Sequence, residues 1–74
     1  MTRRPVTSTA IRSIGHAGDI LEVEFANGVV HQYTGVPREV HDHLVTAKSV
    51  GARFAAQIRG KYPHVCTHIP GKTS

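Results

Sequence analysis

Apolar and charged residues alternate strictly over residues 21–25 of the chain. The apolar positions fall on one side of an extended segment, and two glutamates fall on the other. This alternation predicts an antiparallel strand with one buried face. A second strand is expected over residues 29–33. Because only Ala26, Asn27 and Gly28 separate the two strands, we expect them to form a hairpin.

Two registers are open for this hairpin. A two-residue turn would send Tyr33 to the face that carries the glutamates. A type I turn that ends with Gly28, left-handed in a bulge, pairs Leu21 with Tyr33 instead. We prefer the second register because it gathers the large residues on one face, although it leaves Val30 outside this face and places His31 on it.

A first strand is expected over residues 10–16, before a turn at residues 17–19. Ile11 and Ile14 would fall on opposite faces of a regular strand, because side chains alternate along it. Either a bulge lies between them or one of them faces solvent.

Two short helices are expected after the hairpin. Pro37 is favourable in the first turn of a helix, where its missing amide hydrogen costs nothing. Ser49 is a good N-cap for the second helix, and Gly60 is a natural end for it. Helices this short are not stable alone, so they must pack on the sheet or on each other. The apolar positions repeat at helical spacing, as Val40, Leu44 and Ala47 in the first helix and Val50, Phe54 and Ile58 in the second.

These elements predict an α+β fold in which a three-stranded antiparallel meander carries two short α-helices on one face. Residues 8–62 form the single domain of this prediction. Residues 1–7 are expected to be a flexible leader and residues 63–74 a polar, mobile tail. The chain has 74 residues, and a domain of this size buries only about 60% of the surface that its unfolded chain exposes. We therefore expect a thin core.

Charge and cysteine content narrow the functional classes. The net charge of +4 favours an anionic partner. Cys66 is the only cysteine, so the chain forms no intramolecular disulfide, and the cytoplasm is the expected location. The sequence has no apolar run long enough for a signal peptide or a membrane span.

A series of short motifs runs through the chain in a fixed order: Leu21-Glu22-Val23-Glu24-Phe25, Asn27-Gly28, His31-Gln32-Tyr33, Gly35-Val36-Pro37, Ser49-Val50-Gly51, Phe54 and Ile58-Arg59-Gly60-Lys61-Tyr62. Together they resemble the KTSC domain. That family is named from its occurrence at the C-terminus of some lysyl-tRNA synthetases, and it also occurs as small stand-alone bacterial and phage proteins. The resemblance implies a non-enzymatic binding module, with RNA as the suggested partner.

One position departs from the family pattern. The central motif of the family is Tyr-x-Tyr, whereas this chain has His31 in the first aromatic place and Tyr33 in the second. If the two rings form a stacking platform for bases, the chain keeps half of it. If they are core residues, His31 replaces one of them at some cost in burial.

The start of the second helix is the first candidate site. A helix N-terminus presents backbone amides and a partial positive charge, which attract phosphate. Ser49 adds a hydroxyl group and Gly51 permits close approach, while Lys48 and Arg53 supply full charges. The alternative is that Ser49 only caps the helix and that Gly51 only lets the helix approach the sheet.

A basic stripe would extend this candidate site. Arg53 and Lys61 fall in one row of period four on the predicted solvent side, and Arg59 lies round the helix from them. Cations hold a nucleic-acid backbone, and an aromatic ring such as that of Tyr62 stacks on bases. Tyr33 is a further candidate, although the preferred register places it in the core. The alternative is that the cations serve solubility alone.

Metal binding and catalysis have little support. His64, Cys66 and His68 would share one side of an extended segment, but a mobile tail does not preorganise a metal site. Glu22 and Glu24 fall on a solvent face without a pocket. The chain lacks nucleophile motifs such as Gly-x-Ser-x-Gly. We therefore expect no metal, no cofactor and no enzymatic activity.

The leading hypothesis is a small module that binds RNA or another nucleic acid through the basic helix and its N-terminus. The second hypothesis is a protein-interaction or self-associating accessory module of phage or prophage type, which would use an apolar patch or a sheet edge. The third is an oligomer that captures a small nucleotide between its subunits with the same cations.

Overall fold

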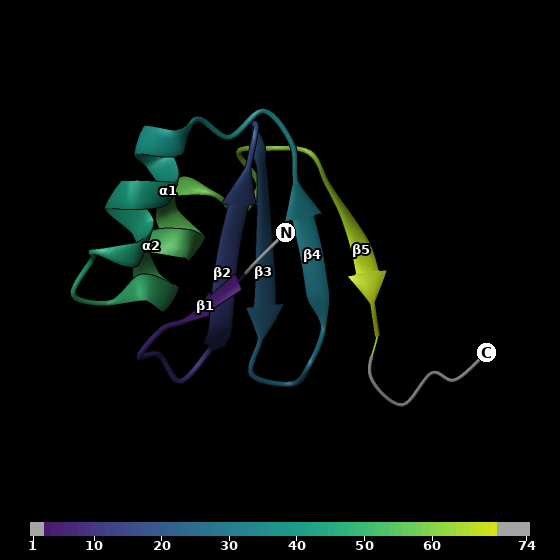
Figure 1. Cartoon of the computed structure of the whole chain (residues 1–74). Coiled ribbons are helices and arrows are strands. Elements are labelled where there is room, and N and C mark those ends of the chain that lie inside the picture. The colour runs from purple at the N-terminus through teal and green to yellow at the C-terminus, as the bar shows by residue number, and fades with distance from the viewer. Residues whose placement is uncertain (1–2, 70–74) are drawn as a thin grey trace.

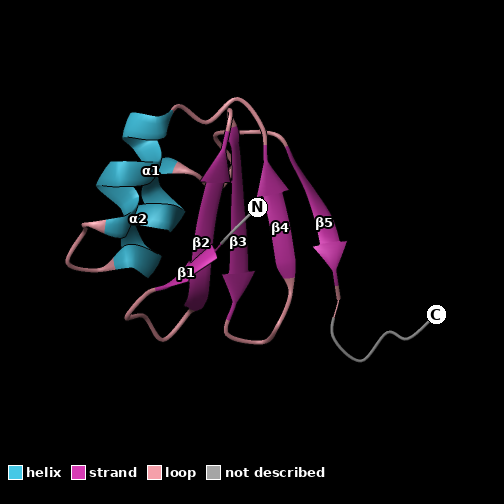
Figure 2. Ribbon diagram, in the orientation of Figure 1, coloured by secondary structure: helices cyan, strands magenta, loops and turns pink. Residues whose placement is uncertain are grey.

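Five antiparallel strands form one sheet, and two helices cover one of its faces (Figures 1 and 2). The computed structural model describes residues 3–69. The strands lie in the sheet in their chain order. The elements are β1 (Arg3–Pro5), β2 (Ile11–Ala17), β3 (Ile20–Phe25), β4 (Val30–Tyr33), α1 (Arg38–Val45), α2 (Val50–Gln57) and β5 (His64–His68).

An irregularity in β2 decides which of its side chains are buried. The pairing of β2 with β3 shifts between Ile11 and Ser13. This extra residue puts Ile11 and Ile14 on the same face, and both are 1% exposed. Of the two alternatives that the sequence left open for this strand, the bulge is confirmed.

The turn between β3 and β4 takes the register preferred from the sequence. Leu21 pairs with Tyr33 and Val23 with His31. Gly28 has a φ of 90° and donates its amide hydrogen to the Phe25 carbonyl oxygen at 2.9 Å. A left-handed glycine closes a bulged hairpin without steric cost. The register follows from this turn.

The core lies between the helices and one face of the sheet. Pro37 precedes the first residue of α1, and the Ser49 hydroxyl caps α2 by accepting the amide hydrogen of Ala52 at 3.3 Å. Gly60, with a φ of 76°, follows the end of α2 as predicted. Ten buried side chains pack into one cluster, and they are Ile11, Ile14, Leu21, Val23, Tyr33, Val36, Leu44, Val50, Phe54 and Ile58.

The predicted number of strands is wrong, because the sheet has five and not three. The two additional strands are its edges, β1 in the expected leader and β5 in the expected tail. β1 has only three residues and ends in Pro5, which an edge strand tolerates. Every residue of β5 is exposed, so its sequence has no alternation between buried and polar positions. The last part of the predicted tail, residues 70–74, lies outside the described residues.

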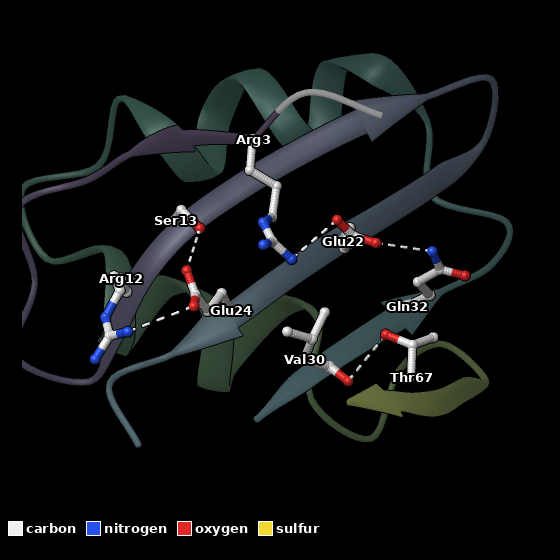
Figure 3. Close-up of polar contacts among 8 residues, drawn as sticks. All are labelled: Arg3, Arg12, Ser13, Glu22, Glu24, Val30, Gln32 and Thr67. Carbon is white, nitrogen blue, oxygen red and sulfur yellow. Dashed lines mark hydrogen bonds and ion pairs between the residues drawn. The ribbon is translucent and has the colours of Figure 1, made fainter. Parts of the chain in front are cut away.

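The face of the sheet opposite the helices is a polar layer in which both glutamates have partners (Figure 3). Arg3 donates from Nη1 to Glu22 Oε2 at 3.0 Å, and Gln32 donates to Glu22 Oε1 at 2.8 Å. Ser13 donates from Oγ to Glu24 Oε1 at 2.9 Å, and Arg12 Nη1 forms an ion pair with Glu24 Oε2 at 3.5 Å. The prediction that these carboxylates are the polar half of a strand is consistent with this layer.

Val30 lies on the polar face and is nevertheless 5% exposed. The sequence placed it outside the main core, and it is not a member of the core cluster. β5 lies beside β4 at this point, and its Thr67 donates from Oγ1 to the Val30 carbonyl oxygen at 3.3 Å (Figure 3). Among residues 3–69, no helix is long and apolar enough to cross a bilayer.

Candidate functional site

The N-terminus of α2 is capped by the side chain of the preceding residue. The Ser49 hydroxyl accepts the amide hydrogen of Ala52, as an N-cap does. Gly51 faces the segment before β2, since a Cβ atom on it would lie 3.4 Å from Ser8 Oγ and 3.5 Å from Ala10 Cβ. Ser49 therefore has a structural role as the cap, and Gly51 lies close to the segment before β2 with room for an ordinary contact.

A shallow groove of about 420 Å³ runs along the exposed side of α2. Three of the predicted site residues line it together, namely Lys48, Ser49 and Arg53. Gln57 lies further along the same groove. We call this surface the α2 groove. Its remaining lining residues are alanines, whose short side chains leave Lys48 and Arg53 accessible to an extended polymer.

The predicted row of cations does not continue as a helical row. Lys61 lies beyond the last residue of α2, in a turn where its amide hydrogen bonds to the Ile58 carbonyl oxygen at 2.9 Å. Lys61 is exposed, whereas Tyr62 is half-buried and packs against the core cluster. The Tyr62 ring is therefore not a free platform for a base.

Arg59 and Tyr33 line a second groove, of about 400 Å³, beside β4 and β5. Tyr33 is 3% exposed and belongs to the core, as its register predicted. Two histidine rings reach this groove, and the ring centroids of His31 and His64 are 4.8 Å apart. Phe54 contributes a ring from α2, 5.5 Å from that of Tyr33. We call this surface the aromatic groove.

The protonation of two side chains in the aromatic groove is shifted. Burial lowers the pKa of His31 below its ordinary value of 6.5, and the neighbouring His64 lowers it further. Burial raises the pKa of the Tyr33 hydroxyl, and the Arg59 guanidinium opposes this rise. The Tyr33 hydroxyl lies in hydrogen-bonding contact with His31 Nδ1 at 3.3 Å. These shifts favour neutral forms of both side chains.

An asymmetry of charge, which our interpretation of the sequence missed, separates the later part of the chain from the earlier part, where Arg4 alone among the arginines has no ion pair with a described residue. No acidic residue follows Asp42 in the sequence. Arg3, Arg12 and Arg38 each pair with a carboxylate. Within residues 3–69, no such pair is formed by the exposed cations of the second half, Lys48, Arg53, Arg59 and Lys61. A count of charges along the chain would have revealed this difference.

A further basic surface lies between β1, β2 and α1, and no motif pointed to it. Two hollows, of about 430 and 500 Å³, are lined from β1, β2 and α1. Arg4 and His41 line both of them. The sequence gives little sign of this surface because β1 was expected to be a flexible leader.

The three ligand-type side chains of β5 do not form a metal site. The pairing of β5 with β4 shifts so that Cys66 lies opposite His31 and His68 lies opposite Val30. Cys66 and His68 therefore face opposite sides of the sheet, and the expectation that His64, Cys66 and His68 share one side is wrong. Among the described residues, no three His, Cys, Asp or Glu side chains are grouped for a metal ion.

Comparison with known proteins gives one family. The model of the KTSC domain matches residues 7–62. An uncharacterized protein of Stutzerimonas stutzeri (strain A1501) is 41% identical over 56 residues, which are 73% of this chain and 79% of the relative. A protein of Tsukamurella paurometabola is 42% identical over 50 residues, which are 65% of this chain and 75% of the relative.

A solved structure is similar to this chain in fold and in sequence. The crystal structure of a KTSC domain protein from Yersinia pestis aligns with a TM-score of 0.86 and 36% identity. The alignment covers 90% of this chain and 97% of that chain. Nearly the whole of that protein is therefore similar to this chain.

Replacing Gly51 by alanine tests whether this glycine is needed for close packing. The added Cβ atom would make ordinary contacts with Ser8 and Ala10. Alanine favours the helix over glycine by about 1 kcal/mol. We therefore expect Gly51→Ala to raise the free energy of unfolding by roughly 0.5–1 kcal/mol in a urea titration. A lower free energy of unfolding in the variant would contradict this account of the contact.

The lowered pKa of His31 predicts a dependence of stability on pH. Below pH 6.5 the unfolded chain takes up a proton at His31 more readily than the folded chain does. The free energy of unfolding should therefore fall as the pH decreases from 6.5 through the lowered pKa of the folded state. His31→Phe removes this contribution and should flatten the profile between about pH 7.5 and about pH 5, measured by urea unfolding.

The control for this experiment is an exposed histidine. His43 lies on the solvent side of α1, so His43→Gln should leave the pH profile of the parent chain nearly unchanged. An equal flattening by both substitutions would mean that burial of His31 is not the cause.

Proposed function

Because the chain belongs to the KTSC domain family, we propose that it is a small non-enzymatic module that binds nucleic acid, RNA in particular, along α2. One observation carries this proposal. The exposed cations Lys48, Arg53, Arg59 and Lys61 have no carboxylate partner within residues 3–69, whereas three of the four arginines that precede them in the chain, Arg3, Arg12 and Arg38, are paired.

Unpaired cations and paired cations differ in what they offer to a phosphate. A paired guanidinium must give up its carboxylate, and at distances well beyond their separation the opposite charges of the pair largely cancel each other's field. An unpaired cation keeps its full field and releases condensed counterions when it meets a phosphate. Lys48 and Arg53 lie together in the α2 groove, so this surface favours an anionic polymer.

The contacts available on α2 do not favour recognition of sequence. Lysine and arginine side chains on an exposed helix hold the phosphate backbone, which is the same for every base. Tyr33 and Tyr62 are engaged in packing, which leaves the half-buried His31 and the exposed His64 as rings that a base can reach. We propose binding of single-stranded RNA with weak sequence preference.

The absence of an enzymatic role belongs to the same proposal. Neither of the relatives described above carries the name of an enzyme. The two glutamates of the sheet, which are the closest pair of carboxylates along the chain, each have hydrogen-bond partners in the polar layer. A cytoplasmic location agrees with the single exposed cysteine, which the cytoplasm would keep reduced.

The test of RNA binding is its dependence on salt. We expect a labelled single-stranded RNA oligonucleotide to bind in fluorescence anisotropy titrations. With three phosphate contacts, the affinity should fall about twentyfold between about 50 mM and about 200 mM salt. Replacing both Arg53 and Lys61 by glutamine should weaken binding and lower the slope of log K against log salt by about 1.4.

Arg12→Gln is the matched control for Arg53→Gln and Lys61→Gln made singly. It removes one positive charge as they do, but Arg12 lies on the polar face of the sheet and pairs with Glu24 (Figure 3). The control should bind RNA within about twofold of the parent chain. If the control lost as much RNA affinity as these single variants, the loss would be due to net charge and not to the position of the cations. If the parent chain did not bind RNA, the proposal would be refuted.

A second candidate function is self-association through β5, and the exposure of that strand favours it. β5 is an edge of the sheet, all of its residues are exposed, and Val65 is 59% exposed. An edge with free backbone groups pairs readily with another strand. In this reading a second copy of the chain would add its β5 in antiparallel pairing.

Val65→Lys tests this candidate. A lysine on an edge strand disfavours pairing between edges, so the variant should sediment as a monomer where the parent chain sediments as a dimer. Because pairing between strands rests on backbone hydrogen bonds, the dimer should persist at high salt, unlike the RNA complex. If the parent chain sediments as a monomer at every concentration, self-association through β5 is excluded.

A further inference from the structure

We infer that the hollow surface between β1, β2 and α1 binds a small organic phosphate whose ester group is apolar or planar. We call this surface the β1–α1 groove. It is formed by the two hollows that Arg4, Ile14 and His41 line together. It goes beyond the proposed function, because a small molecule and not a polymer is its ligand and because it shares only Ala47 and Lys48 with the α2 groove.

The two hollows differ in character. The hollow of about 430 Å³ is walled by aliphatic side chains, among them Val6, Val45 and Val50. The hollow of about 500 Å³ is walled by Arg4, His16, Arg38 and His41. Small-molecule sites usually enclose about 300–1,000 Å³ and combine an apolar wall with a few polar groups. A ligand with an apolar half and an anionic half matches this division.

The charges around the groove specify an anion of about two charges. Arg4, Arg38 and Lys48 line it, and no described residue that lines it is acidic. The carboxylate of Asp42 is bound to two of the lining residues, since it accepts hydrogen bonds from Arg38 Nε at 3.3 Å and from His41 Nδ1 at 3.0 Å. Three cations and one carboxylate leave an excess of two positive charges. A phosphate monoester carries about −1.5 to −2 at neutral pH, whereas a carboxylate carries only one charge.

Two histidine rings are already ordered at the centre of the groove. The His16 and His41 rings stack with centroids 5.3 Å apart and an interplanar angle of 29°. His16 donates from Nε2 to the Val36 carbonyl oxygen at 2.7 Å, and Asp42 fixes His41. Side chains that are fixed before binding lose little entropy when a ligand arrives. The stacked pair offers a flat surface to a planar group next to the arginines.

The experiment uses the full chain and three probes, which are AMP, adenosine and inorganic phosphate, followed by amide chemical shifts. We expect AMP to shift the amides of β1 and of the first turn of α1. AMP should bind at least about tenfold more tightly than inorganic phosphate, because the apolar hollow contributes only to the ester. Adenosine, which lacks the phosphate, should bind at least about tenfold more weakly than AMP.

Substitutions assign the binding to this groove. Arg4→Gln and Arg38→Gln should each weaken AMP binding about tenfold, the usual effect of losing one charged hydrogen bond. Arg38 is well exposed, so its replacement leaves the fold intact, and the amide spectrum of each variant confirms folding. Arg12→Gln on the opposite face of the sheet is the control and should bind AMP as the parent chain does.

Three outcomes would overturn the inference. The first is the absence of AMP-induced shifts at β1 and α1 in the parent chain. The second is equal affinity for AMP and inorganic phosphate. The third is an equal loss of affinity in Arg12→Gln and Arg38→Gln. Because RNA binding is tested with Arg53 and Lys61, the two proposals fail independently.

Discussion

The contact between the helices and one face of the sheet is the interaction on which the rest of the structure depends. The side chains of Leu21, Val23 and Ile58 lie in it completely buried. A chain of 74 residues has few large apolar side chains, so this single layer must use nearly all of them. The bulge in β2 and the left-handed glycine after β3 are what bring those side chains to one face. An error of one residue at either place would turn the strand over.

The elements that make this contact are the ones that could be predicted from the sequence. The alternation in β3 and the spacing of Val50, Phe54 and Ile58 in α2 leave a clear pattern because one side of each element is buried. β1 and β5 leave no such pattern, since they are edge strands held by backbone pairing and not by an apolar face. A prediction based on the pattern of buried positions therefore finds the three inner strands and misses the two edge strands.

The candidate sites also differ in how far they could be predicted from the sequence. The roles of Ser49 and Gly51 could be anticipated as alternatives, because a helix cap and a phosphate site use the same residue types. The β1–α1 groove could not be anticipated, because it exists only when β1 pairs with β2 and carries Arg4 toward α1. Its residues come from three segments that are distant in the sequence, and no local spacing connects them.

The distribution of acids limits where an anion can bind. Glu22 and Glu24 face away from the helices and hold Arg3 and Arg12 on that side. This leaves the polar face nearly neutral and places the net charge of +4 mainly around the helices. Hydrogen bonds to the Asp42 carboxylate, first from His41 and then from Arg38, hold the pKa of this carboxyl below its ordinary value. Asp42 therefore stays ionised and orders both of these side chains. A polyanion and a small phosphate would therefore both approach from the helical side, where Lys48 is the cation that the two grooves share.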